Sequence, residues 1–180
     1  TAAGIKVFHL PEPSEGYIAY LKNLKKLIKE NSYSIIHAHT MYNCGWAMLM
    51  GKLMGVPCRI SHSHSIKMAD HHYSLHQRVY QFVMRYFIRW CGTDYIGCGK
   101  AAGAWLYGEK FFREKGKIIY NGIDTEQFKY SRESRDRLRR ELNLEDKFVV
   151  GHAGHFVEVK NQRFLISLMP EILRRRPETV

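Results

Sequence analysis

The sequence lacks the features that would indicate a membrane-spanning protein or a disulfide-bonded one. It contains no run of about 20 apolar residues, and its N-terminus has no apolar segment of the kind found in signal peptides. Its four cysteines show no C-x-x-C spacing and lie within apolar segments: Cys44, Cys58, Cys91 and Cys98. We therefore expect no membrane span, and reduced, buried thiols in a cytosolic protein.

Acidic residues are also scarce relative to basic ones. The chain has 17 Asp and Glu against 28 Lys and Arg, which gives a net charge of +11. This excess favours anionic partners, such as nucleotide phosphates, an acidic membrane surface or nucleic acid. A hydrophobic content of 45% excludes the intrinsically disordered class and is enough for a packed core.

Hydrophobic periodicity predicts strands that alternate with helices. Such alternation is typical of an α/β fold, a Rossmann-like parallel sheet flanked by helices. A length of 180 residues allows one domain, or one and part of a second. The expected strands are 4–9, 34–39, 57–62, 94–98, 117–120 and 147–153, and the expected helices are 15–30, 43–54, 75–90, 100–107, 131–142 and 161–175.

Histidines gather at the ends of two predicted strands. His37 and His39 alternate along one strand, so their side chains share a face, and His62 and His64 repeat the pattern on the next strand. Both pairs should emerge at the carboxyl edge of the sheet, where open α/β folds bind ligands. A purely structural alternative is that one histidine of each pair is buried and bonded to a backbone carbonyl.

A metal site is a second alternative for these histidines. Neutral imidazoles suit zinc, and Asp70, His71 and His72 could add ligands in a metal-dependent hydrolase. A hydrolase site would usually have several carboxylates at the strand ends, whereas this stretch has only Asp70. We therefore predict that the four strand-end histidines share no metal ion.

A second group of candidate residues lies near the end of the chain. A predicted strand runs into a loop that contains Gly154, and Lys160 stands where the next helix begins. Glycine lets the backbone approach an anion, helix amides point toward it, and lysine supplies a full charge. Residues 151–161 therefore predict an anion site.

Two motifs in this half of the chain carry a family resemblance. Asn121, Gly122, Ile123, Asp124 and Phe128 fit N-G-[IV]-D-x-x-x-F, while Gly154, Phe156, Lys160 and Asn161 fit G-R-F-x-x-x-K-N with His155 in the arginine position. The chain resembles the retaining GT-B glycosyltransferases that build bacterial capsular and exopolysaccharides. The resemblance covers nearly the whole chain but only the middle of the family's length.

The resemblance implies a division into domains and a partial GT-B fold. Residues 1–145 would be the later part of an acceptor-binding domain with its linker. Residues 146–180 would be the first strand and helix of the nucleotide-sugar domain. Asn121, Gly122 and Asp124 would form the hinge, without a catalytic role. Since most of the donor domain would be missing, we expect the chain alone to be inactive.

The resemblance also implies roles for the site residues. Gly154, His155, Lys160 and Asn161 would bind the donor diphosphate, His62 and His64 would be catalytic beside the transferred sugar, and His37 and His39 would line the acceptor side. The donor would be a nucleoside-diphosphate sugar, with no bound cofactor or metal. The acceptor would be an oligosaccharide or a lipid-linked glycan, and the enzyme cytoplasmic, with the inner membrane face as a candidate location.

The predicted helix 75–90 has two interpretations. Its three arginines (Arg78, Arg85 and Arg89) could form a solvated edge while Val79, Phe82, Val83, Tyr86 and Trp90 pack in the core. Alternatively, the helix could contact an anionic membrane. A basic nucleic-acid-binding domain is the remaining alternative for the chain, and we rank it last because basic residues are spread over many helices.

Overall fold

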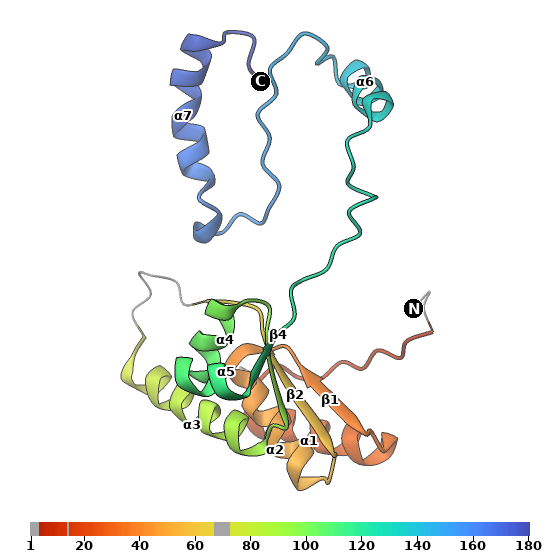
Figure 1. Cartoon of the computed structure of the whole chain (residues 1–180), viewed down its shortest axis with the longest axis vertical. Coiled ribbons are helices and arrows are strands. Elements are labelled where there is room, and N and C mark those ends of the chain that lie inside the picture. The colour runs from red at the N-terminus through yellow and green to blue at the C-terminus, as the bar shows by residue number, and fades with distance from the viewer. Residues whose placement is uncertain (1–3, 14, 67–72) are drawn as a thin grey trace. The chain divides into compact units, whose positions relative to one another are not determined.

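The computed structural model describes residues 4–13, 15–66 and 73–180 (Figure 1). The chain forms two compact units, Thr1–Asn121 and Gly122–Val180. The boundary falls within the predicted hinge, whereas the sequence placed the domain boundary between residues 145 and 146. The charged helix at about 131–142 therefore groups with the second unit, while the assignment of either unit to a named domain stays a prediction.

The first unit is built on a four-stranded sheet in the order β1-β2-β3-β4, with every neighbouring pair parallel. Its strands are β1 (Ile35–Ala38), β2 (Cys58–Ser63), β3 (Asp94–Gly97) and β4 (Gly116–Ile118). These confirm the four predicted strands of this part of the chain, each to within a residue or two at its ends. They also confirm the parallel α/β fold class, because helices connect each strand to the next.

Helices flank the sheet (Figure 1). They are α1 (Tyr17–Asn31), η1 (Met41–Asn43), α2 (Cys44–Leu53), α3 (Leu75–Cys91), α4 (Lys100–Tyr107) and α5 (Glu109–Lys115). A capping box starts α3, where the Ser74 side chain accepts from the Gln77 amide and the Gln77 side chain accepts from the Ser74 amide. Helix α5 was not predicted; it begins directly after Gly108, whose φ of 86° ends α4.

The core lies between the sheet and the helices. Its fully buried members include Cys44, Met48, Met84, Ile88, Cys91, Leu106 and Tyr107. The Tyr107 hydroxyl lies 2.6 Å from the Ser61 carbonyl and 2.9 Å from the Ile96 carbonyl, so it connects α4 to two strands. All four cysteines are free thiols, as predicted, but only Cys44 and Cys91 are buried, while Cys58 and Cys98 are partly exposed.

Two expected strands are wrong. Residues 4–9 form no strand, and Ile5, Val7 and Phe8 are exposed. A strand needs a partner for its backbone groups, and the apolar pattern alone does not supply one. Residues 147–153 form no strand but only an isolated parallel bridge between Phe148 and Thr179.

The core-packing interpretation of helix 75–90 is also wrong for most of its residues. The buried side chains of α3 are Met84, Ile88 and Cys91, whereas Val79, Phe82, Val83, Tyr86 and Trp90 are exposed. Two arginines expected on a solvated edge turn inward instead. Arg85 donates to the Trp105 and Leu106 carbonyls at 2.9 Å each, and Arg89 donates to the Tyr107 carbonyl at 2.8 Å. They thereby satisfy the last carbonyls of α4.

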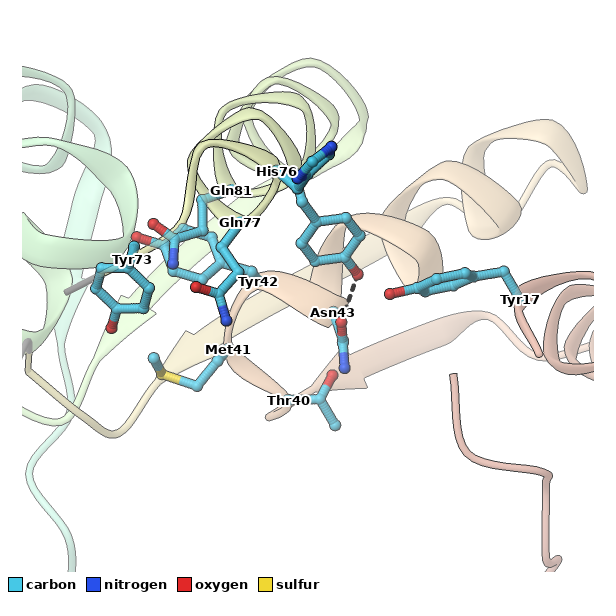
Figure 2. A pocket seen from close by; sticks show the side chains of 10 residues that line it. Tyr17, Thr40, Met41, Tyr42, Asn43, Tyr73, His76, Gln77 and Gln81 are labelled. Carbon is cyan, nitrogen blue, oxygen red and sulfur yellow. Dashed lines mark hydrogen bonds between the residues drawn. The ribbon is translucent and has the colours of Figure 1, made fainter. Parts of the chain in front are cut away.

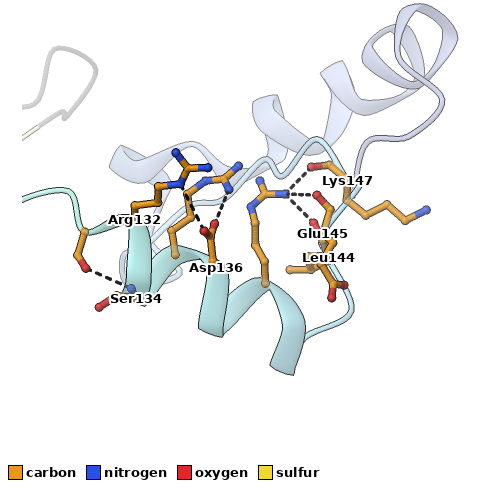
Figure 3. Close-up of polar contacts among 9 residues, drawn as sticks. Arg132, Ser134, Asp136, Leu144, Glu145 and Lys147 are labelled. Carbon is orange, nitrogen blue, oxygen red and sulfur yellow. Dashed lines mark hydrogen bonds and ion pairs between the residues drawn. The ribbon is translucent and has the colours of Figure 1, made fainter.

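The second unit contains α6 (Arg132–Glu141), η2 (Glu158–Lys160) and α7 (Gln162–Arg175). No residue of α6 is buried, which confirms its prediction as a solvated helix. Figure 3 shows how α6 is held: Ser131 caps it by accepting from the Ser134 amide, and Arg132 pairs with Asp136. Arg139 donates to the Leu144 and Lys147 carbonyls at 2.6 and 2.8 Å, which fixes the turn after the helix.

Candidate functional site

The four strand-end histidines form one row of rings at the carboxyl edge of the sheet. The β1–β2 register pairs Ala38 with Ser61, so His39 stands level with His62, one residue further along each strand. Ring centroids of His37 and His39 are 4.1 Å apart, those of His39 and His62 are 5.0 Å apart, and those of His62 and His64 are 4.1 Å apart. The predicted gathering of these side chains at one edge is therefore confirmed.

Hydrogen bonds cross between the two strands within this row. His39 Nδ1 lies 2.8 Å from His64 Nε2, and His62 Nδ1 lies 3.3 Å from His37 Nε2. His62 is the buried member, at 7% exposure, and its Nε2 has no hydrogen-bond partner within the described part of the chain. Its Nδ1 contact is to His37, so the expected bond from a buried histidine to a backbone carbonyl is not what positions His62.

Three rings of the row, those of His37, His39 and His62, are held in their neutral form. Burial first, and then the neighbouring charges of His64, His39 and His37, lower the pKa of His62 to about 4. Burial also lowers the pKa of His37 and of His39, with smaller contributions from the other rings of the row. A neutral imidazole has one donor and one acceptor nitrogen, so at pH 7 each of these three rings can either donate a hydrogen bond to a hydroxyl group or accept one from it.

The same geometry bears on the metal alternative. One ring nitrogen each from His37, His39 and His62 falls within 4.8 Å of the other two, so these three could hold an ion. No carboxylate joins them among the residues that the structure describes, and the proposed additional ligands Asp70, His71 and His72 lie outside that part. That the four histidines share no ion stays a prediction.

A pocket of about 560 Å³ opens beside the row (Figure 2). Thr40, which follows His39 directly, lies on its wall. The other lining residues come from α1, from η1, and from the start of α3 and the residue before its cap: Tyr17, Met41, Tyr42, Asn43, Tyr73, His76, Gln77, Tyr80 and Gln81. Sequence reasoning missed this pocket because its walls come from three elements that only the tertiary fold brings together.

The pocket wall is aromatic and carries amides and hydroxyls, and the lining residues that the structure describes include no Lys, Arg, Asp or Glu. Tyr80 is fixed by two bonds: its hydroxyl donates to Asn43 Oδ1 at 2.5 Å and accepts from Trp46 Nε1 at 3.1 Å. Burial raises the pKa of Tyr80, so this hydroxyl stays protonated. The Tyr17 ring lies 5.8 Å from the Tyr80 ring. Such a wall suits an uncharged ligand with both apolar faces and hydroxyl groups.

The predicted anion loop lies in the second unit. Helix α7 begins at Gln162, two residues after Lys160, where η2 ends, so Lys160 stands close to a helix start as expected. The Lys160 stem runs alongside Gly154, since a Cβ added to that glycine would lie 3.7 Å from Lys160 Cγ. Gln162 Nε2 donates to the His155 carbonyl at 2.7 Å, which ties the loop to the helix.

Gly154 and Lys160 are therefore brought together, with Asn161 between Lys160 and the helix. Asn161 has a left-handed backbone, at φ 49°, and is the residue before the first turn of α7. The Phe164 amide donates to the Asn161 carbonyl at 3.1 Å, which leaves the amides of Gln162 and Arg163 as the helix-start donors that could bind an anion. At the hinge, Asp124 Oδ1 accepts from the Glu126 amide at 3.1 Å and so stabilises a turn.

Comparison with known proteins places the chain in a family. The sequence profile of glycosyltransferase family 4 matches residues 2–127, which include the histidine row and the hinge residues Asn121, Gly122 and Asp124. The chain belongs to glycosyltransferase family 4. It is 31% identical over 176 residues to EpsF of Bacillus subtilis, which is assigned as a glycosyltransferase. The match covers 96% of this chain and 46% of EpsF. Neither the hydrolase nor the nucleic-acid-binding alternative is favoured by these matches.

A second curated relative is the capsular polysaccharide biosynthesis glycosyltransferase CapH of Staphylococcus aureus, 27% identical over 154 residues. The match covers 86% of this chain and 40% of CapH. The chain therefore spans less than half the length of the curated relatives it matches.

Solved structures agree on the fold. Anabaena HepE in complex with UDP-glucose matches with a TM-score of 0.74 at 22% identity, over 97% of this chain and 45% of HepE. HepE in complex with UDP matches with a TM-score of 0.69, over 89% of this chain and 42% of HepE. This chain thus has part of the GT-B fold. In the described residues, no helix is both long and apolar enough to cross a membrane.

Proposed function

We propose that this chain supplies the acceptor side and the start of the donor side of a retaining hexosyltransferase. The enzyme would transfer a sugar from a nucleoside-diphosphate sugar to an oligosaccharide or lipid-linked acceptor in surface polysaccharide synthesis. The observation that carries the proposal is the family match over residues 2–127, because it contains the histidine row at the ligand-binding edge of the sheet. Retention and a cytoplasmic location belong to the same proposal.

The donor diphosphate would bind at the start of α7. The Lys160 stem packs beside Gly154, and Lys160 lies two residues before the first turn of α7. Charge builds on the leaving diphosphate as the glycosidic bond breaks, so a fixed ammonium group and helix amides stabilise the transition state more than the ground state. HepE, which shares the fold, is described in complex with UDP and with UDP-glucose, and this supports a uridine nucleotide as the donor to try first.

The transferred sugar would lie against His62 and His64. His64 is exposed at the edge, and its Nε2 is within hydrogen-bond distance of His39 Nδ1, so the tautomers of the two rings depend on each other. His62 is neutral, and its buried Nε2 would bond a sugar hydroxyl only if the rings around it moved. His37, bonded to His62, would position that ring rather than contact the reacting atoms. No step of the proposal uses a metal ion or a bound cofactor.

The acceptor would enter the pocket beside Thr40. The pocket wall has aromatic faces for the C–H faces of a pyranose ring and amide groups for its hydroxyls, and its described lining residues include no lysine or arginine for a diphosphate. These lining residues support the binding of an uncharged saccharide end, and not of the donor diphosphate, on the acceptor side. Gln81→Ala should therefore raise KM for the acceptor while leaving KM for the donor unchanged.

The test is sugar transfer by the parent enzyme, the longer protein expected to contain this chain, and by the chain itself. The parent, given UDP-glucose, UDP-galactose or UDP-N-acetylglucosamine and membrane extract as acceptor source, should release UDP and incorporate labelled sugar. The chain alone should do neither, because a donor must be held from both domains. Incorporation by the chain would mean that the donor site lies elsewhere, and failure of the parent with every donor would contradict the proposed function.

A further inference from the structure

Helix α3 presents an apolar stripe to solvent. The stripe consists of large apolar residues at helical spacing: Leu75, Val79, Phe82, Val83, Tyr86 and Trp90. At about 100° per residue these positions fall within an arc of about 100°, on the side of the helix opposite Met84 and Ile88 in the core. Leu75 is 75% exposed and Phe82 is 73% exposed, so most of the surface of these two side chains is in solvent.

Among the described residues, the charges on α3 and at the end of its stripe are basic. No Asp or Glu occurs between Leu75 and Cys91. Arg78 is exposed on the helix, and Lys52 Nζ lies 3.6 Å from the Trp90 ring centroid, at the end of the stripe. No carboxylate of the described residues pairs with Lys52 or Arg78. The first unit has 16 Lys and Arg against 7 Asp and Glu, so it carries +9 of the chain's +11.

The two other arginines of α3 hold the helix against α4. Arg85 and Arg89 are occupied by the carbonyls at the end of α4, so they do not cover the stripe. Their bonds fix the helix to α4 and thereby fix the direction in which the stripe faces. The exposed apolar surface is therefore part of a rigidly packed helix and not of a loop that could fold over it.

We propose that the α3 stripe lies in the headgroup region of an anionic lipid bilayer. A bilayer surface offers an apolar layer for Phe82 and Val79, an interfacial layer for Tyr86 and Trp90, and negative headgroups for Lys52 and Arg78. A second copy of the chain fits less well. Two stripes face to face would bring basic residues together, and α3 has no acidic residue to pair with them. This inference does not rest on the proposed transfer reaction.

The test is binding to vesicles. The purified chain is sedimented with vesicles of phosphatidylcholine alone and with vesicles that contain about one-third phosphatidylglycerol, at about 0.1 M salt. We expect binding to the anionic vesicles, together with a blue shift of tryptophan emission that Trp90→Phe removes. Phe82→Gln should weaken binding about tenfold, and Lys52→Gln or Arg78→Gln about fivefold each.

Matched controls show whether vesicle binding is specific to the stripe or results from exposed apolar residues in general. Ile18→Gln changes an equally exposed apolar residue on α1, and it should bind vesicles as the wild type does. Thermal melts of each variant show that it is folded. The proposal is overturned if the wild type ignores anionic vesicles, or if Ile18→Gln weakens binding as much as Phe82→Gln.

Two further outcomes would give the stripe a different partner. A chain that is dimeric by light scattering, and that Phe82→Gln makes monomeric, would show that the stripe is a self-interface and overturn the proposal. Binding by the chain but not by the parent enzyme would show that another part of the parent covers the stripe, with the same consequence. Transfer activity of the parent is measured separately, so failure of the proposed function leaves the vesicle result interpretable.

Discussion

His39 and His64 come from neighbouring strands, and their ring nitrogens lie 2.8 Å apart, so one ring must donate and the other must accept. That requirement allows at most one of the two facing nitrogens to carry a proton. The parallel register makes the contact, because it sets His39 level with His62 and lets His64 reach back from the following position. The histidine row is thus a coupled group, and both its protonation and its binding of a metal ion can be tested.

Acidification should destabilise the chain through this row. The pKa of His62 is about 4 in the folded chain and 6.5 ordinarily, so the unfolded chain binds more protons between those values. The free energy of unfolding should therefore fall as the pH is lowered from 6.5 to 4. Urea unfolding of the wild type should show a loss roughly 2–3 kcal/mol larger than that of His62→Asn. His76→Asn, outside the row, serves as control, and equal losses in wild type and His62→Asn would contradict the prediction.

Metal analysis should find no stoichiometric ion in the row. Three ring nitrogens could be drawn together, but no carboxylate of the described residues adds charge to balance a dication. Elemental analysis of the chain purified without chelators or an affinity metal should give well under one zinc per chain. A crystal structure with an ion about 2.0–2.1 Å from the imidazole nitrogens of His37, His39 and His62 would overturn this prediction.

Lys160→Ala should cut kcat/KM of the parent enzyme by on the order of 10²–10³, because it removes one group that stabilises charge on the leaving diphosphate. The measurement is a saturation curve in the nucleotide sugar at fixed acceptor. Arg163→Ala, on the first turn of the same helix, is the matched control and should lose far less. Near-wild-type activity of Lys160→Ala would contradict the proposal that Lys160 binds the donor diphosphate.

His155→Arg should be tolerated by the parent enzyme and should raise activity above pH 7. Arginine keeps its charge there, whereas an imidazole is mostly neutral unless a bound phosphate protonates it. A pH–rate profile of wild type and variant, with one nucleotide sugar, checks this. If the variant is inactive while still folded, position 155 requires an imidazole, and the arginine role implied by the resemblance does not apply to it.

Tyr107→Phe should destabilise the first unit by about 1–3 kcal/mol. The Tyr107 hydroxyl is fully buried and lies within hydrogen-bond distance of the Ser61 and Ile96 carbonyls, which would be left without this donor. Urea unfolding followed by circular dichroism measures the change. Tyr120→Phe, on an exposed tyrosine, should be neutral, and equal stability of the two variants would show that water or backbone rearrangement replaces the lost bond.

The sequence by itself determined the parallel sheet and the place of the candidate site. Four short apolar runs between helical segments were sufficient to predict β1 to β4, because a buried parallel strand is apolar on both faces. The alternation of His37 with His39, and of His62 with His64, was sufficient to predict one shared edge, because side-chain direction along a strand has a fixed period of two. The motif around Lys160 likewise predicted a helix start there.

Tertiary structure decided what periodicity does not encode. The apolar runs at 4–9 and 147–153 resemble strands, but pairing depends on a neighbour whose backbone groups are free, and a single run does not specify it. For α3, the amphipathic pattern was visible but its buried side was not. The inward turn of Arg85 and Arg89 onto α4 sets Met84 and Ile88 in the core and leaves Phe82 in solvent. The pocket beside Thr40 likewise exists only because α1, η1 and α3 meet in space.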